Sequence, residues 1–424
     1  MKPPSDVSDT LVPAPSGRGG GAGPLEVRIH RTGEELLAAL RGVLDAIPGS
    51  PRGPQALATR LGIDKVLASR ILAAVRSADP LFVVHRAPGP EPLRRTVSAI
   101  AREGVDAALV LRAARAVDDF ERLIRDEIGD RQSLEAIVSA WVPEARREFE
   151  LRRKQSAFKA LSHLRGAMVN ALTATVFLAP SADDPDRLDV VWVNGLIGLL
   201  RLRPTAAVKL ATRRFGPEPR RRQPLTLDRE PIERLSHVLA EFSSSPLPPF
   251  EVVRAGDTVH YVLGGEGYGP RSAVDLVMAE VNLSEMRRTV PAGSGRKGYV
   301  FAEVSIPAAV MQLDAFVHEG VYPGATPSIR VYDTAFEGVA DANDRARDID
   351  ALDVAETVES LGTGLSGCRS ADVPRYTDLL RQVCARMRWS PESFRGYRCR
   401  VEYPLYGTQV TMLFDPAGNA GGIG

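Results

Sequence analysis

Five aspartates close together in one run form a set of potential metal ligands. Carboxylate oxygens at such spacing can hold Ca²⁺ or Mg²⁺. The run lacks the central glycine and the terminal glutamate of an EF-hand loop, and Arg345 and Arg347 inside it would oppose a cation. We therefore expect a capped, solvated loop and no metal site. The five residues are Asp341, Asp344, Asp348, Asp350 and Asp353.

Other reactive side chains do not form a catalytic pattern. The sequence contains no G-x-S-x-G elbow, no Walker loop and no H-E-x-x-H motif. The glycine-rich run at 264–269 lacks the strand and helix around a phosphate-binding loop, so a hairpin loop is favoured. None of the six histidines pairs with another at ligand spacing: His30, His85, His163, His237, His260 and His318. We expect no cofactor and a protein that is not an enzyme.

Two stretches combine tyrosines with arginines. The first is residues 320–324, followed by Arg330 and Tyr332, and the second is residues 397–406, which include Arg398 and Arg400. Aromatic and guanidinium groups at strand ends can line a small-molecule or partner site. Core and hairpin packing explain them equally well, so both interpretations stay open.

Composition favours a soluble globular protein of two or three domains. The chain has 424 residues, of which 44% are hydrophobic and 25% charged. A formal net charge of +1 means that any nucleic-acid contact must come from a local basic patch. Cys368, Cys384 and Cys399 lie far apart without zinc-binding spacing, which fits a reducing cytoplasm. No apolar run is long enough to span a membrane, and the N-terminus does not resemble a secretory signal.

The stretch from Gln55 to Leu72 has the spacing of two short helices joined by a tight turn. Gly62 can adopt the left-handed conformation that ends a helix, and Asp64 is placed to cap the next one. Apolar residues recur on one face of each helix. They are Leu57, Ala58 and Leu61 on the first, and Val66 or Leu67, Ile71 and Val75 on the second.

The run from Ala58 to Leu72 resembles the helix-turn-helix of bacterial transcription regulators, with the pattern A-x-x-L-G-(V/I)-x-x-x-x-(V/A)-S-R-x-L. The resemblance extends at most to about Val97 and does not cover the rest of the chain. Ala68 departs slightly, since a larger branched residue is usual there. The matching residues are Ala58, Leu61, Gly62, Ile63, Ala68, Ser69, Arg70 and Leu72.

The resemblance implies that the second helix enters the major groove of DNA and presents its early residues to base edges. An arginine such as Arg70 can bind a guanine through two hydrogen bonds, or a phosphate. The DNA-binding residues expected on this helix are Lys65, Val66, Ser69, Arg70 and Arg76. The alternative is an ordinary helical hairpin within a helical domain.

The segments that flank the motif are expected to complete its domain. Leu25–His30 alternates like a short strand, and Thr32 and Glu35 form a capping box before a helix that ends near Ile47. After the motif, Leu81–Val84 and Leu93–Val97 have the composition of two strands.

Those two strands would form a wing that places Arg94 and Arg95 against the phosphates. Alternatively, Pro92 begins a helix. Both interpretations stay open.

We predict an α+β multidomain protein whose sheet is mostly antiparallel. A disordered tail (1–24) precedes a (winged) helix-turn-helix domain (25–100) and a helical linker or dimerisation region (105–166). An antiparallel β-containing segment (167–245) and an α+β sensor or interaction domain (250–424) follow. In 167–245 we expect strands at Leu188–Val193 and Leu196–Arg203 and a helix at Pro231–Phe242. In 250–424 we expect helices at Pro307–Val317 and Val373–Arg388.

Together these observations predict a cytoplasmic, homodimeric one-component regulator that binds double-stranded DNA and senses a small-molecule effector or partner. The alternative is an enzyme or scaffold of unknown reaction, in which the helical hairpin serves only as structure. An exposed basic face on residues 64–76 favours the regulator, whereas a buried or neutral one favours the alternative.

Overall fold

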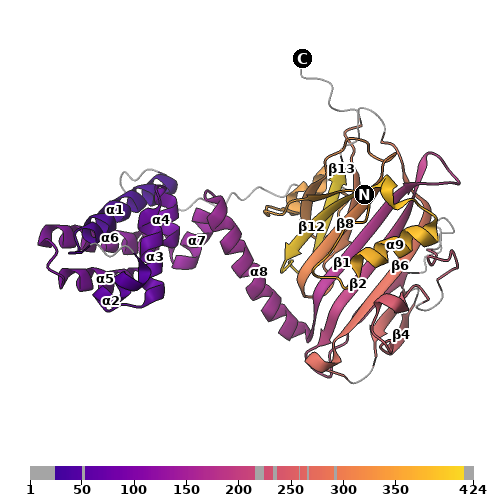
Figure 1. Ribbon diagram of the computed structural model, residues 1–424, viewed down its shortest axis with the longest axis horizontal. Coiled ribbons are helices and arrows are strands. Elements are labelled where there is room, and N and C mark those ends of the chain that lie inside the picture. The colour runs from indigo at the N-terminus through magenta and orange to yellow at the C-terminus, as the bar shows by residue number, and fades with distance from the viewer. Residues whose placement is uncertain are drawn as a thin grey trace, which may run out of the picture. The chain divides into compact units, whose positions relative to one another are not determined.

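The computed structural model describes residues 24–49, 53–214, 224–232, 236–256, 258–264, 267–290 and 294–414. The chain divides into two compact units, residues 1–150 and 151–424 (Figure 1). Helices make up the first unit, and all the strands of the described residues lie in the second, so the class is mixed α+β. The predicted tail lies, up to residue 23, outside the described residues. None of the described helices has the length and apolar character needed to cross a bilayer.

One hydrophobic core holds the first unit together. Its elements are α1 (Leu25–Asp45), α2 (Pro54–Leu61), α3 (Lys65–Arg76), α4 (Pro80–Arg86), α5 (Pro90–Ala101), α6 (Ala107–Arg122), a π-helical turn at Leu123–Ile128, α7 (Arg131–Ser139) and the start of α8 (Pro143–Arg165). Phe120 of α6 and Leu134 of α7 are fully buried in the same core as Leu57 and Ile71. The predicted boundary near residue 100 therefore does not separate two cores.

The predicted strand at Leu25–His30 is wrong, because these residues form the first turns of α1. Ile29 is fully buried and lies on the same helical face as Leu36, Leu40 and Val43. The buried residues thus recur at helical spacing from Ile29 onward, even though residues 25–30 also alternate between apolar and polar side chains. Thr32 and Glu35 consequently lie inside the helix and do not cap it.

The predicted wing is also wrong, because both of its strands are helices, α4 and α5. Pro80 and Pro90 occupy the first helical positions, where a missing N–H is tolerated. The alternative of a helix after the turn was correct, although α5 begins at Pro90, two residues before Pro92. Burial decides the outcome, since Leu93, Thr96, Val97 and Ile100 recur at helical spacing in the core.

The second unit is built on a six-stranded sheet with the order β11-β12-β8-β1-β2-β6. Its neighbours are antiparallel except for the parallel pair β1 and β8. A four-stranded sheet has the order β10-β9-β13-β7, and a three-stranded sheet has the order β3-β5-β4. The strands are β1 (Ala167–Pro180), β2 (Arg187–Arg201), β3 (Lys209–Arg214), β4 (Phe250–Ala255), β5 (Thr258–Leu263), β6 (Val274–Arg287), β7 (Gly298–Glu303), β8 (Ala308–His318), β9 (Ser328–Asp333), β10 (Ala351–Leu352), β11 (Glu359–Thr363), β12 (Phe394–Glu402) and β13 (Thr408–Phe414).

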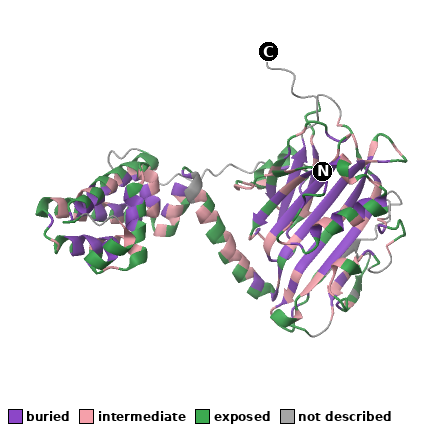
Figure 2. Cartoon of the chain, viewed as in Figure 1, coloured by how far each residue is buried: buried purple, intermediate pink, exposed green. Residues whose placement is uncertain are grey.

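The six-stranded sheet is covered on both faces. Helix α9 (Tyr376–Met387) packs on one face, where Phe177 and Phe316 meet Leu380 and Val383. On the other face the four-stranded sheet contributes Met412 and its neighbours to a second core. Figure 2 shows the long central strands as largely buried. Burial on both faces explains why these strands are almost continuously apolar.

Three further predictions in this unit are wrong. The helix expected at residues 307–317 is strand β8 (Ala308–His318), because a short apolar run does not distinguish a doubly buried strand from a buried helix. The two strands expected within 188–203 are the single strand β2. Within the described part of 231–242, only Ala240–Phe242 is helical, while Val238 bridges to the edge strand β6.

The predicted division between 167–245 and 250–424 does not hold either, since β1 and β2 share a sheet with β6, β8, β11 and β12. The helix expected at 373–388 is confirmed as α9.

Candidate nucleic-acid interface

The turn between α2 and α3 is held by local backbone and side-chain contacts. Gly62 has φ 65° and ψ 33°, the left-handed conformation that ends α2. The N–H of Ile63 donates to the carbonyl of Ala58 at 3.1 Å. The Asp64 carboxylate accepts hydrogen bonds from the N–H groups of Val66 at 2.7 Å and Leu67 at 3.3 Å. The two helices, the glycine turn and the aspartate cap are thus confirmed as predicted.

Packing sorts the residues of α3 into a buried and an exposed face. Ala68, Ile71, Leu72 and Val75 are buried against the rest of the unit. Ala68 is completely buried, so a small side chain fits there. Of the two candidates for the apolar face, Leu67 is half-buried whereas Val66 is 67% exposed.

The exposed face of α3 carries the residues expected to contact DNA. They are Lys65, Val66, Ser69, Arg70 and Arg76, together with Ala73. Arg70 also donates a hydrogen bond to the carbonyl of Ala87 at 3.4 Å, which uses one of its five N–H groups. Across α2 and α3 the cations are Arg60, Lys65, Arg70 and Arg76. Asp64 is the acid of this stretch, and its carboxylate is engaged at the helix cap.

The two arginines expected on a wing differ in the contacts that they make within the unit. Arg94 of α5 donates to Asp118 at 2.9 Å and also pairs with Glu121. These carboxylates raise the pKa of Arg94 above its ordinary value. Arg94 is therefore committed to α6, while Arg95 is exposed.

One basic residue of this region, Arg102, was not anticipated. It caps the C-terminus of α5 and is exposed. Arg95, Arg102 and the Gly62 turn line the same cavity, which has a volume of about 660 Å³. The seven-residue spacing of the two arginines would have indicated a shared helical face if α5 had been predicted as a helix.

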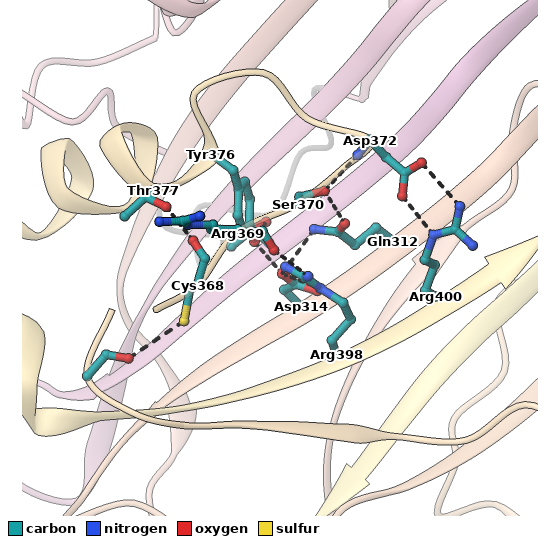
Figure 3. Close-up of polar contacts among 12 residues, drawn as sticks. Gln312, Asp314, Cys368, Arg369, Ser370, Asp372, Tyr376, Thr377, Arg398 and Arg400 are labelled. Carbon is teal, nitrogen blue, oxygen red and sulfur yellow. Dashed lines mark hydrogen bonds and ion pairs between the residues drawn. The ribbon is translucent and has the colours of Figure 1, made fainter. Parts of the chain in front are cut away.

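A buried polar network in the second unit contains Arg398, from the second tyrosine- and arginine-rich stretch. Asp314 on β8 is fully buried, and Arg398 on β12 donates to both of its oxygens, at 2.9 and 2.7 Å (Figure 3). The hydroxyl of Tyr376, at the start of α9, donates to Asp314 at 2.5 Å. Burial raises the pKa of Asp314, while hydrogen bonds from Arg398, Tyr376 and Gln312 oppose that rise. The network ties α9 and the loop before it to the sheet.

The other residues of these stretches are largely packed. Tyr332 is buried, and the rings of Tyr322 and Tyr397 lie against Phe414. In the aspartate-rich loop, Asp344 accepts from the N–H of Ala346, and Arg347 pairs with Asp350 at 2.6 Å. This is the capped loop expected from the sequence.

A smaller cavity of about 310 Å³ lies in the second unit, where β7 approaches β1, β2 and β6. Trp192 and Phe301 supply aromatic walls, while Asn194, Glu280 and Glu303 supply polar groups. Trp192 and Glu280 are cross-strand partners on β2 and β6. The cavity thus combines apolar surface with a few polar groups, as small-molecule sites do.

Comparison of this chain with protein-family models, curated proteins and solved structures finds no match.

Proposed function

We propose that the protein is a cytoplasmic one-component transcriptional regulator that binds specific DNA sequences through α3. The observation that carries this proposal is the exposed face of Lys65, Ser69 and Arg70 directly after a glycine turn and an aspartate cap. A helix presented in this way can enter the major groove with its N-terminal residues at the base edges. The exposed basic face also favours this reading over the enzyme or scaffold alternative.

Support for dimerisation comes from large apolar side chains exposed in the region 105–166. They are Leu111, Trp141, Leu151 and Leu164. A second subunit can cover such side chains where they gather in one contiguous patch. We propose a homodimer, which predicts two half-sites in the operator with a fixed spacing. Sedimentation of the full-length chain measures the oligomeric state.

We propose that the second unit senses a small-molecule effector in the 310 Å³ cavity beside Trp192. An effector there would touch both sheets of the unit, because β7 belongs to one and β2 to the other. A ligand screen by thermal shift, repeated with Trp192→Ala, tests this part. Ligands that raise the melting temperature of the wild type and of Trp192→Ala equally would contradict binding in this cavity.

The central test is selection of bound sequences from a random pool of duplex DNA, followed by Arg70→Ala. We expect enrichment of a defined sequence, and a loss of about 1–3 kcal/mol in operator binding when Arg70 is replaced. Arg112→Ala on α6 is the control, since it removes another exposed arginine that lies outside α3. No enrichment, or unchanged binding by Arg70→Ala at moderate salt, contradicts the proposal.

A further inference from the structure

A groove beside the N-terminal end of α3 is lined on one wall by three arginines, Arg94, Arg95 and Arg102. Ile63 and Leu67, both half-buried, form part of its lining, and Arg95, Ser98 and Arg102 line it from α5. Residues seven apart in a helix lie on the same face, about 10 Å apart along its axis. The wall therefore presents the guanidinium groups of Arg95 and Arg102 along a line.

These two guanidinium groups are available to a ligand. Arg95 and Arg102 are exposed, and their side chains make no ion pair or hydrogen bond with any residue that the structure describes. Two other arginines nearby are committed, since Arg94 pairs with Asp118 and Glu121, and Arg60 pairs with Glu103. An available guanidinium can bind a phosphate through two parallel hydrogen bonds.

The groove walls are held in place by those committed pairs. The Arg60–Glu103 pair joins α2 to the residue that follows Arg102, and Arg94 joins α5 to α6. Two acids also line the groove. Asp64 is engaged with the N-terminus of α3, and Glu91 lies 3.9 Å from Arg94. Asp64 and Glu91 thus each have a partner within the unit, whereas the guanidinium groups of Arg95 and Arg102 have none among the described residues.

We infer that Arg95 and Arg102 bind phosphates of one DNA strand, so that α5 is a second DNA-contacting element and sets the register of α3. This inference rests on the proposed function. The groove adjoins the end of α3 that carries Lys65, Val66 and Ser69, which is the end expected to meet base edges. A backbone contact at that end fixes the position of the readout residues without reading sequence itself.

The test measures DNA affinity of the full-length chain as a function of salt, on the selected operator and on an unrelated duplex. The variants are Arg95→Gln, Arg102→Gln and the double variant, with Arg112→Gln on α6 as the control. Each single variant should weaken binding to both duplexes by the same factor and lower the slope of log K against log salt by about 1, and the double variant by about 2. Glu91→Gln, which removes an acid from the groove, should tighten binding to both.

The outcomes separate this inference from the proposed function. If the double variant binds DNA as tightly as the wild type and with the same salt slope, the inferred phosphate contacts are overturned. In that case α3 remains the proposed DNA-binding helix. An equal effect of Arg112→Gln also overturns them, because it shows a response to net charge alone. Failure of the wild type to bind any DNA overturns the proposed function as well. Circular dichroism should be the same for all variants, since exposed charges contribute little to folding.

Discussion

Asp314 shows how a single buried charge constrains the second unit. Its carboxylate is fully buried and receives hydrogen bonds from Arg398, Tyr376 and Gln312. These donors come from β12, α9 and β8, so the carboxylate connects three elements. A buried ion pair adds little compared with apolar packing, but the loss of one partner leaves an uncompensated charge. The free energy of unfolding should therefore fall most when Asp314 is replaced and Arg398 is kept.

Replacement of Asp314 by Asn should destabilise the second unit by about 3–5 kcal/mol, because Arg398 would remain with its side chain largely buried. Tyr376→Phe leaves Arg398 paired with Asp314, removes the hydrogen bonds of the Tyr376 hydroxyl with Asp314 and Thr175, and should cost about 1–3 kcal/mol. Unfolding in urea measures both values. A loss below about 1 kcal/mol for Asp314→Asn would show that the network carries little energy.

The three cysteines should be unreactive in the folded protein. All three are buried, and burial raises the pKa of Cys384 and of Cys399 to about 12 and also raises that of Cys368. The nucleophilic thiolate is thus scarce in the native state at pH 8, whereas in the unfolded chain the thiol pKa is about 8.5. Labelling with Ellman's reagent should be slow without denaturant and rapid in urea. Rapid labelling of the native chain would contradict the burial.

At the scale of elements, close backbone contact between helices explains which glycines are needed. A Cβ added at Gly33 of α1 would lie 2.3 Å from the carbonyl oxygen of Pro80 in α4. The same addition at Gly42, also in α1, meets only Leu109 Cδ2 at 3.8 Å, which is an ordinary contact. Two glycines in one helix therefore have different roles, one permitting the approach of α4 and the other not.

These two glycines give a matched prediction. Alanine in a helix gains up to about 1 kcal/mol over glycine. At Gly42 that gain should appear as a higher melting temperature. At Gly33 the clash with the α4 backbone costs about 1–3 kcal/mol, so Gly33→Ala should be destabilising. Thermal denaturation followed by circular dichroism measures both, and stabilisation by Gly33→Ala would show that α1 and α4 separate easily.

At the scale of the whole molecule, the chain consists of two units with separate cores. The core of the first unit contains residues of its helices and turns from Ile29 to Val142, and the cores of the second contain residues from 167 onward. Multidomain chains of this kind often unfold in more than one step. This division also separates the proposed DNA-binding face from the proposed effector cavity.

Calorimetry of the full-length chain should accordingly show two unfolding transitions. Gly33→Ala should lower the temperature of one transition, and Asp314→Asn should lower that of the other. If both variants shift the same transition, the two units unfold cooperatively.

Local chemistry made part of this protein predictable from its residues alone. The turn at Gly62 and the cap at Asp64 depend on contacts within about one helical turn, so their residue types are sufficient to indicate them. The exposed face of Lys65, Ser69 and Arg70 follows from helical periodicity around that turn. Helix α9 was likewise predictable, because apolar residues recur at helical spacing along its sequence.

Other features were decided only by the tertiary structure, because distant residues compete with local pattern. Leu93–Val97 resembles a strand until the core of the first unit selects its helical face, and that choice places Arg95 beside Arg102. Strand β8 is a strand because β1 and β12 lie on either side of it. Asp314, Tyr376 and Arg398 are separated by up to 84 residues, so no local spacing indicates that they meet.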